Sequence, residues 1–296
     1  MAASYDGKII KGIAGFYYVY TEAGTFQCRA RGLFREKGLK PLAGDNVRIE
    51  LTKTEDVEGN VVEVYDRKNS LIRPPVANID QALIIFSAHS PEPVWGLLDR
   101  FLVNMAYEDI PAVICINKDD LTKEGECGQI KNDYEKSGAE VLFTSASSGS
   151  GVDDLKEILK DKTTTVAGPS GVGKSSLINR LTGESLMETG EISKKVMRGK
   201  QTTRHTELIP LGKNTFIFDS PGFSSLDTAD ISKENLRDYY NEFAEYNNLC
   251  RYNMCSHTHE PDCEVRKAVE EGKISRLRYD SYISIYNELK ERRKYT

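Results

Sequence analysis

The order of the nucleotide-binding motifs along this chain constrains its fold more than any other feature. Two patterns, N-K-x-D at residues 117–120 and S-A-S at residues 145–147, come before a third, G-x-x-x-x-G-K-S, at residues 168–175. In an ordinary small GTPase the third pattern opens the domain and the first two close it. A fourth pattern, D-x-P-G at residues 219–222, usually stands mid-domain and here comes last. This order predicts a circularly permuted nucleotide-binding domain.

Residues 168–175 predict a phosphate-binding loop, because a strand-like run at 164–167 precedes them and a helical pattern at 176–181 follows. The glycines let backbone N–H groups close around the phosphates. Lys174 reaches the β- and γ-phosphates as a catalytic group, and the Ser175 hydroxyl binds Mg²⁺. The predicted phosphate-binding residues are Gly168, Pro169, Ser170, Gly171, Val172, Gly173, Lys174, Ser175 and Ser176.

The patterns at residues 117–120 and 145–147 predict the base-binding end of the same site. The carboxylate of Asp120 accepts hydrogen bonds from guanine N1–H and from its exocyclic amine, a pair that adenine does not offer, so guanine is selected. Asn117 braces the loop, the Lys118 stem packs over the base, and the Ala146 N–H meets guanine O6. The predicted base-binding residues are Asn117, Lys118, Asp119, Asp120, Ser145 and Ala146. GTP and GDP are therefore the expected ligands.

Asp219 ends a strand-like run and is predicted to hold Mg²⁺ through water, while Gly222 offers its N–H to the γ-phosphate. The next residue is Phe223, at a position where many GTPases carry the glutamine that orients the attacking water. A phenyl ring cannot orient water. Slow intrinsic hydrolysis is therefore expected.

The basic residues 198–205 predict a switch segment in which a threonine binds Mg²⁺ and senses the γ-phosphate. Thr202 and Thr203 both suit this role, and Thr203 is preferred. The predicted Mg²⁺ ligands are Ser175, Thr203 and Asp219.

Three cysteines and a histidine lie within fourteen residues, in the spacing C-x4-C-x-H-x5-C. Four soft ligands so close together suit one tetrahedral Zn²⁺ with no open position, which is a structural site. The predicted ligands are Cys250, Cys255, His257 and Cys263. His259 is an alternative ligand that the spacing alone does not exclude.

Composition narrows the class of protein. A net charge of −5 gives no global electrostatic case for nucleic-acid binding, so any RNA contact must come from local patches. The sequence contains no run of about 18 apolar residues and no N-terminal apolar segment, so no membrane partner is expected and the predicted compartment is the cytoplasm.

The chain is expected to be multi-domain. Short β-rich runs broken by glycine and proline predict a β-barrel of the OB-fold type at residues 1–70. Its basic side chains suit either contact with RNA or a solvated strand face. Alternating apolar strands and helices predict the central α/β phosphate-loop domain at residues 71–224. Helical patterns at 232–246, 264–271 and 275–294 predict a mostly helical zinc-binding domain at residues 225–296.

Taken together, the permuted motif order, the barrel pattern, Phe223 after D-x-P-G and the C-x4-C-x-H-x5-C cluster resemble the small ribosomal subunit biogenesis GTPase family, RsgA or YjeQ. The resemblance covers essentially the whole chain. It implies an OB-fold, a central GTPase and a zinc-binding domain that act on the 30S ribosomal subunit and its 16S rRNA late in maturation. The family commonly has a histidine before the switch threonines, a proposed catalytic residue. This chain has Gln201 there, so Gln201 is the predicted group that positions water, with His205 as the alternative.

The function expected from sequence is therefore hydrolysis of GTP to GDP by a monomeric ribosome-assembly factor, stimulated by the 30S subunit. Two other readings stay open at this point. One is a nucleotide-dependent RNA-binding module whose hydrolysis is not essential, and the other is a zinc-stabilised GTPase that regulates a protein partner.

Overall fold

The computed structural model describes residues 3–32, 34, 38–52, 58–71, 75–183, 207–219 and 231–292, with the backbone alone for Asp219 and Arg292. The chain forms two compact units. The first comprises residues 1–81, 156–166 and 188–223, and the second comprises residues 82–155, 167–187 and 224–296.

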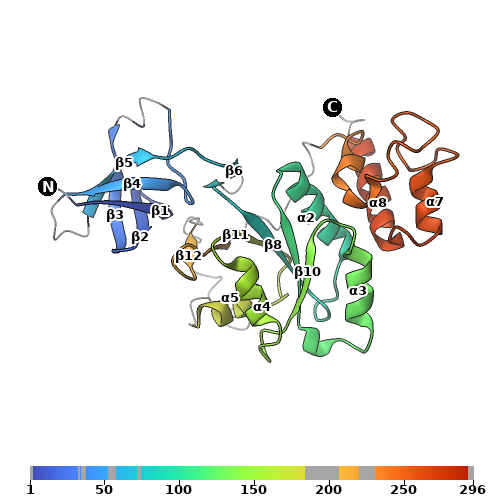
Figure 1. Cartoon of the computed structure of the whole chain (residues 1–296), viewed down its shortest axis with the longest axis horizontal. Coiled ribbons are helices and arrows are strands. Elements are labelled where there is room, and N and C mark those ends of the chain that lie inside the picture. Colours follow the sequence, from blue (N-terminus) through green and yellow to red (C-terminus); the bar gives the residue numbers. More distant parts are fainter. Residues whose placement is uncertain are drawn as a thin grey trace. The chain divides into compact units, whose positions relative to one another are not determined.

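The N-terminal strands close into a five-stranded barrel in the order β1-β2-β3-β5-β4 (Figure 1). Its strands are β1 (Ser4–Ile13), β2 (Phe16–Thr21), β3 (Gly24–Ala30), β4 (Asn46–Leu51) and β5 (Glu58–Val64). Neighbours pair antiparallel except β3 and β5, which are parallel. Alternate residues face the interior, as in β4, where Val47, Ile49 and Leu51 are buried. The predicted barrel of the OB-fold type is confirmed.

A six-stranded sheet follows, in the order β10-β9-β8-β11-β13-β12. Its strands are β8 (Gln81–Ser87), β9 (Ala112–Asn117), β10 (Glu140–Thr144), β11 (Thr163–Ala167), β12 (Leu208–Pro210) and β13 (Phe216–Asp219). β9 is parallel to β8 and β10, and β11 is parallel to β13. β8 and β11 are buried along their whole length, as in parallel strands covered on both faces. The antiparallel edge strand β12 was not predicted.

Helices and turns follow these strands and carry the motifs. The elements are η1 (Asp119–Leu121), α2 (Trp95–Tyr107), α3 (Glu126–Tyr134), α4 (Val152–Leu159) and α5 (Lys174–Thr182), with a short β6–β7 pair (Ser70–Leu71 and Val76–Ala77) before the sheet. Asn117 ends β9, Ser145 follows β10, Gly168 follows β11 and Asp219 ends β13. The motifs thus stand at carboxyl ends of strands, where open α/β sheets bind their ligands. No helix among the described residues is both long and apolar enough to cross a membrane.

The C-terminal region, residues 231–292, consists of short helical elements that pack on α8. They are η3 (Leu236–Tyr239), η4 (Asn241–Phe243), α7 (Glu264–Glu270) and α8 (Arg276–Arg292), and α8 packs against α2 and α3. A helix across 232–246 was expected, and the structure has two 3₁₀ turns instead. The rings of Tyr240 and Phe243 pack against Tyr282 of α8, with centroids 5.2 and 4.9 Å apart. Burial of these rings, rather than helix propensity, determines the backbone conformation of residues 232–246.

A buried charge cluster joins α8 to its neighbours. Arg278 is 1% exposed; it donates to Glu242 Oε1 at 2.7 Å through Nε and to Asp99 of α2 through a guanidinium nitrogen. Its guanidinium also lies over the rings of Tyr134 and Tyr240. Burial alone would lower the pKa of Arg278, but the charges of the two carboxylates hold it well above its ordinary value. Buried charges persist only with such partners, so this cluster fixes α8 against α2 and α3.

Candidate guanine-nucleotide site and candidate zinc centre

The loop between β11 and α5 has the backbone of a phosphate cradle. Gly168 has φ of 138°, and a Cβ on it would stand 2.0 Å from the carbonyl oxygen of Ile85 in β8. Gly173 has φ of 92°, and a Cβ on it would stand 2.4 Å from Nδ2 of Asn117. Only glycine fits both places. The loop therefore runs tightly against β8 and the end of β9 before the chain enters α5.

The amine of Lys174 folds back over this loop. Lys174 Nζ donates to the carbonyl oxygens of Gly168 at 2.9 Å and Pro169 at 2.7 Å. Lys174 is also the first residue of α5, whose first-turn N–H groups have no partners within the helix. A helix N terminus, a glycine-lined loop and an ammonium at one place are the chemistry that nucleotide phosphates require. Ser175 and Ser176 lie half-buried in the same first turn, and Ser170 is exposed on the loop.

Asn117 connects the three motifs of the second unit. Its buried side chain donates from Nδ2 to the Val172 carbonyl oxygen at 2.8 Å. Its Oδ1 accepts from the Ala146 N–H at 3.1 Å and from Thr144 Oγ1 at 3.3 Å. The structure thus brings the predicted base-binding and phosphate-binding residues together. The Ala146 N–H, which was predicted to meet guanine O6, is directed at Asn117 instead, so a base must share or replace this bond.

Lys118 and Asp120 frame the position expected for the base. Lys118 has a left-handed backbone, with φ of 62°, and its Nζ donates to the Gly171 carbonyl oxygen at 2.9 Å. Asp119 accepts from Ser150 Oγ at 3.1 Å. Asp120 is exposed, and no described residue bonds or pairs with its carboxylate. The carboxylate is therefore free to accept from a base.

The loop between β8 and α2 also belongs to this site, although no motif marked it. The Ser90 carbonyl oxygen accepts from Lys118 Nζ, and Pro91 lies against Gly171. The neighbouring His89 bridges Glu126 at 2.8 Å and Glu92 at 3.2 Å. Both hydrogen bonds raise the pKa of His89, and the one to Glu126 contributes more than the one to Glu92. The one available sequence signal was the position of the loop, directly after a fully buried strand.

Several predicted residues lie outside the described part of the chain. They are Gly222, Phe223, Gln201, Thr202, Thr203 and His205. For Asp219 the backbone is described, with Val166 as its parallel partner in β11. The predictions for water positioning and for the Mg²⁺ ligands Thr203 and Asp219 therefore stay predictions.

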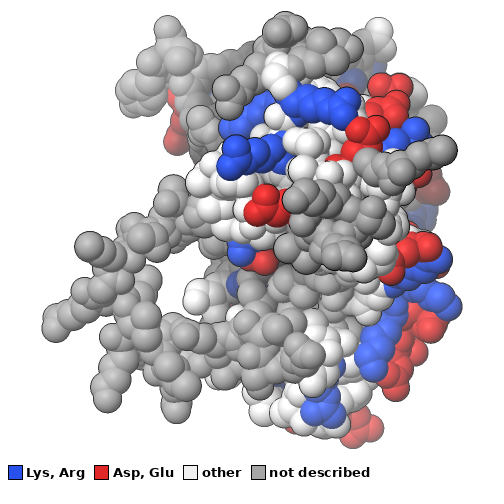
Figure 2. Space-filling view, turned by 90° about the vertical axis from the view of Figure 1, so that its left-hand side faces the viewer, with Lys and Arg blue, Asp and Glu red and all other residues white. Residues whose placement is uncertain are grey.

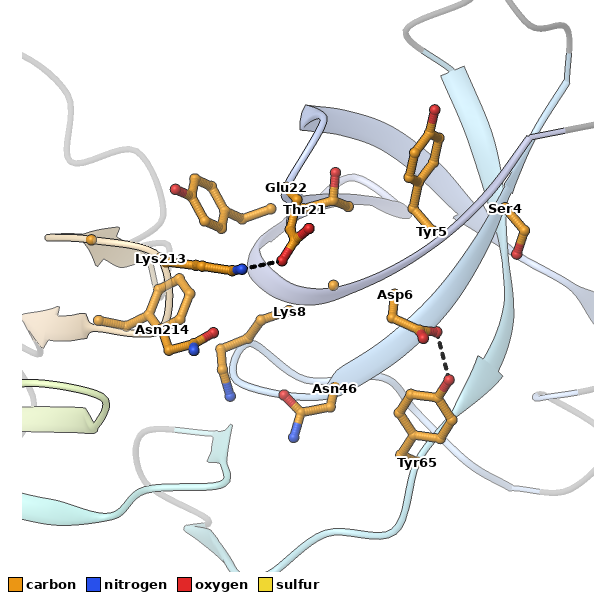
Figure 3. Close-up of a pocket in the computed structure, with 14 residues that line it drawn as sticks. Ser4, Tyr5, Asp6, Lys8, Thr21, Glu22, Asn46, Tyr65, Lys213 and Asn214 are labelled. Atoms are coloured by element: carbon orange, nitrogen blue, oxygen red, sulfur yellow. Dashed lines mark hydrogen bonds and ion pairs between the residues drawn. The ribbon is translucent and has the colours of Figure 1, made fainter.

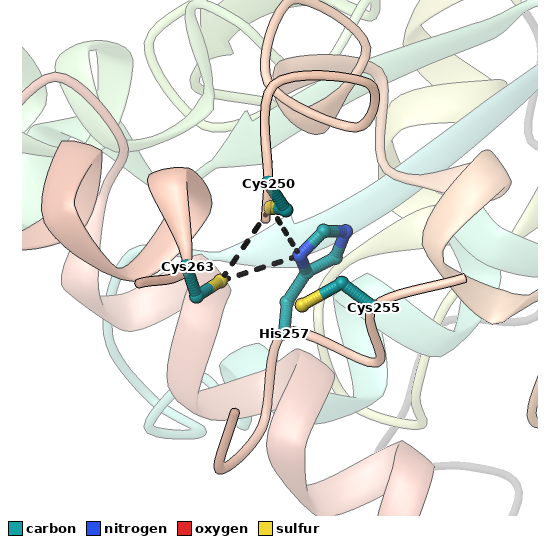
Figure 4. Close-up of side chains that lie close together, drawn as sticks. All are labelled: Cys250, Cys255, His257 and Cys263. Carbon is teal, nitrogen blue, oxygen red and sulfur yellow. Dashed lines mark hydrogen bonds between the residues drawn. The ribbon is translucent and has the colours of Figure 1, made fainter. Parts of the chain in front are cut away.

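The four predicted zinc ligands converge between η4 and α7 (Figure 4). The ligand atoms of Cys250, Cys255, His257 and Cys263 all lie within 4.8 Å of one another. The Sγ atoms of Cys250 and Cys263 are 3.9 Å apart. A tetrahedral site with Zn–S bonds of about 2.3 Å places its sulfurs about 3.8 Å apart, so donor set and spacing both fit zinc. His259 is exposed and is not part of the cluster.

Surrounding contacts orient the histidine and the loop of this cluster. His257 Nε2 lies 2.9 Å from Oδ1 of Asn247, which can only accept, so Nε2 carries the hydrogen and Nδ1 faces the thiols. Burial lowers the pKa of His257 to about 4, which leaves the imidazole neutral and able to bind a metal at pH 7. Tyr279 of α8 donates to the His257 carbonyl oxygen at 2.7 Å. The cluster is thereby anchored to α8.

Cys255→Ser is expected to reduce bound zinc from one per chain to well below one, because a hydroxyl replaces a thiolate ligand. Structural zinc sites of this kind contribute about 10–16 kcal/mol of apparent binding free energy at pH 7. Guanine-nucleotide binding should persist, since none of the nucleotide-site residues that the structure describes contacts the cluster. Elemental analysis and GDP titration measure the two quantities.

Cys127→Ser is the matched control for this variant, because Cys127 is a half-buried thiol outside the cluster that contacts Thr122 Oγ1. It should retain full zinc. If protein prepared without chelator contains no zinc, or if the two variants contain equal amounts of zinc, the cluster is not a metal site.

Comparison with known families decides what kind of protein this is. A family model described as RsgA GTPase matches residues 64–229, more than half of the chain, and a model described as RsgA N-terminal domain matches residues 6–60. The chain belongs to the RsgA GTPase family. As a member of the RsgA GTPase family it is a GTPase, which is the enzyme class that the sequence predicted.

Relatives and solved structures of the RsgA GTPase family extend this match over the whole chain. The small ribosomal subunit biogenesis GTPase RsgA of Agathobacter rectalis is 52% identical, and the alignment covers 98% of this chain and 99% of the relative. The crystal structure of YloQ, described as a circularly permuted GTPase, has a TM-score of 0.79 and 37% identity over 98% and 96% of the two chains. YjeQ from Thermotoga maritima has a TM-score of 0.79 and 32% identity over 97% and 99%. The predicted circular permutation is confirmed.

Proposed function

We propose that this protein is a ribosome-biogenesis GTPase that binds the small ribosomal subunit and its 16S rRNA late in assembly, in the cytoplasm, as a monomer. Its hydrolysis of GTP to GDP is stimulated by the 30S subunit and leads to its release. The observation that carries the proposal is the 52% identity, over almost the full length of both chains, to a protein named small ribosomal subunit biogenesis GTPase RsgA.

The roles of individual residues are part of the same proposal. Phosphate binding by residues 168–176 is supported by the glycine-lined loop, the Lys174 amine and the start of α5. Base binding by residues 117–120, 145 and 146 is supported by the Asn117 hydrogen bonds and by the free carboxylate of Asp120. When bound, Mg²⁺ neutralises charge on the phosphates, and Ser175, Thr203 and Asp219 are its proposed ligands. Gln201 is the residue proposed to position water, with Gly222 donating to the γ-phosphate.

We also propose a role for each of the three domains. Residues 1–70 form an RNA-contacting barrel, residues 71–224 the GTPase, and residues 225–296 a domain held by one structural Zn²⁺. The donor set of Cys250, Cys255, His257 and Cys263 supports the last assignment.

Protein loaded with a non-hydrolysable GTP analogue is expected to sediment with purified 30S subunits and not with 50S subunits, and to sediment less when loaded with GDP. Centrifugation through a sucrose cushion measures this. Asp120→Asn at the same GTP-analogue concentration is the control, because it should stay nucleotide-free and remain in the supernatant. Equal recovery with 30S and 50S particles, or none with either, would exclude small-subunit binding.

A further inference from the structure

The first compact unit contains a cavity of about 900 Å³ that no motif predicted. The barrel strands β1, β2 and β4 line one part of it, and the turn and strand of the β12–β13 hairpin line another (Figure 3). The residues that matter for its chemistry are Lys8, Tyr20, Asn46, Lys213, Asn214 and Phe216. Its size falls within the range of about 300–1,000 Å³ that is usual for ligand sites.

Three contacts hold the hairpin against the barrel. Lys11 Nζ lies 2.6 Å from Glu207 Oε2, and Lys213 Nζ lies 2.5 Å from Glu22 Oε1. The rings of Tyr20 and Phe216 meet edge to face, with centroids 5.6 Å apart. The wall of the cavity is therefore made by two parts of the chain that are far apart in sequence and in direct contact.

Among the charged side chains that line this cavity, the ammonium of Lys8 has the weakest interactions with other protein groups. Its Nζ donates to the Gly44 carbonyl oxygen at 3.2 Å and lies 5.6 Å from the centre of the Phe216 ring. Among the described residues, no carboxylate lies within ion-pair distance of it, and the two nearby carboxylates, Asp80 and Asp45, pair with Lys68 and Arg67. Burial lowers the pKa of Lys8. An ammonium with unused donors beside a cavity favours an anionic ligand.

The other charges that line the cavity already have partners. Asp6 accepts from Tyr65 at 2.6 Å and from Arg48 at 3.0 Å, and Glu22 is paired with Lys213. Among the described charged residues that line the cavity, Lys8 is therefore the one without an ion-pair partner. Two basic side chains elsewhere on the described barrel are also engaged: Arg31 pairs with Glu50, and Arg29 lies over the Phe16 ring. Figure 2 shows blue and red side chains interspersed on the face it presents, without a single-sign field.

The remaining lining groups suit a planar, polar ligand. The side-chain amides of Asn46 and Asn214 project into the cavity from β4 and from the hairpin turn (Figure 3), and no described residue bonds to either amide. Amides offer one acceptor and two donors, which match the edges of nucleobases. The aromatic rings of Tyr20 and Phe216 provide the apolar surface against which bases pack.

We propose that this cavity binds one unpaired nucleotide of an RNA strand, with the phosphate at Lys8 and the base beside Tyr20, Asn46 and Asn214. The proposal rests on the proposed function, in which the RNA belongs to the small subunit. It adds a consequence for hydrolysis. The hairpin begins directly after residues 198–205 and its strand β13 ends at Asp219, so it connects the two segments predicted to sense the γ-phosphate. RNA bound in the cavity contacts this hairpin, so loss of RNA binding at the cavity should reduce the stimulation of hydrolysis by the 30S subunit.

Lys8→Met keeps the aliphatic stem of the side chain and removes its charge, and Asn214→Ala removes an exposed amide. Lys160→Met is the matched control, because Lys160 is 65% exposed, belongs to the same unit and lies outside the cavity. The probe is a fluorescein-labelled single-stranded RNA pentamer, measured by anisotropy at two salt concentrations. Basal and 30S-stimulated phosphate release are measured on the same preparations.

Lys8→Met should weaken pentamer binding by roughly ten- to a hundredfold, as expected for one charge-assisted hydrogen bond. It should also make the slope of log affinity against log salt shallower by about 0.7, the value for one phosphate contact on single-stranded nucleic acid. Asn214→Ala should weaken binding several-fold without changing this slope. Both variants should lose part of the 30S stimulation and keep basal turnover and GTP affinity, and Lys160→Met should match the original chain in every measurement.

Pentamer binding that is absent from the original chain, or unchanged in both variants, would overturn the proposal. Lost stimulation with unchanged pentamer binding would also overturn it, because the cavity would then receive a protein segment. If the original chain shows no 30S stimulation while the variants still lose pentamer binding and salt dependence, the cavity assignment holds and the proposed function fails.

Discussion

Asp120→Asn is expected to lower GTP affinity by about 10²- to 10⁴-fold and to create affinity for xanthosine triphosphate. The carboxylate offers two acceptors for the N1–H and amine donors of guanine, and charge-assisted hydrogen bonds contribute about 1.5–3 kcal/mol each. An amide offers one acceptor and one donor, which match the N1–H and O2 of xanthine. The exposed carboxylate has no bond to a described residue that the change would break. The folded protein should therefore be unaffected.

Competition titration against a fluorescent guanine nucleotide measures this effect, with xanthosine triphosphate titrated in parallel. Asp109→Asn is the control for loss of a negative charge. Asp109 lies exposed in the turn after α2 with φ of 55°, a conformation that asparagine tolerates well. The affinities of the Asp109→Asn variant for GTP and for xanthosine triphosphate should equal those of the original chain. Unchanged GTP affinity in Asp120→Asn would place the base elsewhere in the protein.

Features that depend on neighbouring residues in the sequence were predictable. The tight glycine loop between β11 and α5 could be predicted because its glycines, Lys174 and Ser175 stand together between a strand and a helix. The cluster of three cysteines and a histidine could be predicted because its four residues fall within fourteen positions, and their side chains do converge. Parallel strands such as β8 and β9 could be recognised because burial on both faces requires continuous apolar runs.

Features that depend on distant contacts were not predictable. The loop with Ser90 and Pro91 has no motif of its own and meets Lys118 only because β8 and β9 are adjacent. From the sequence, Arg278 would be interpreted as a surface charge on α8. Its burial requires Asp99 and Glu242 from two other elements. The segment 232–246 has a helical pattern, yet packing of Tyr240 and Phe243 against α8 imposes 3₁₀ turns.

The second large effect concerns activation by the ribosomal subunit. GTP turnover by the isolated protein is expected to be slow, because Phe223 occupies the position of the glutamine that orients water in many GTPases. Positioning and charge stabilisation supplied by a partner contribute about 10³- to 10⁵-fold to the rate of this chemistry. The 30S subunit is therefore expected to raise turnover strongly. A stimulus that acts, as proposed, through contacts to RNA phosphates should weaken steeply as salt concentration rises.

Gln201 and His205 are distinguished in the same assay. If Gln201 positions water, Gln201→Ala should lower 30S-stimulated turnover while GTP affinity stays unchanged, because the side chain acts only during hydrolysis. His205→Ala should then retain stimulated turnover. The reverse result would assign the role to His205.

The most direct test of 30S-stimulated hydrolysis is phosphate release under excess GTP, with purified 30S and 50S subunits titrated separately at low and high salt. We expect slow release by the protein alone, a large saturable increase with 30S subunits that falls at high salt, and little change with 50S subunits. Equal turnover with and without 30S subunits at both salt concentrations would contradict a ribosome-assembly role and favour a GTPase that serves a protein partner.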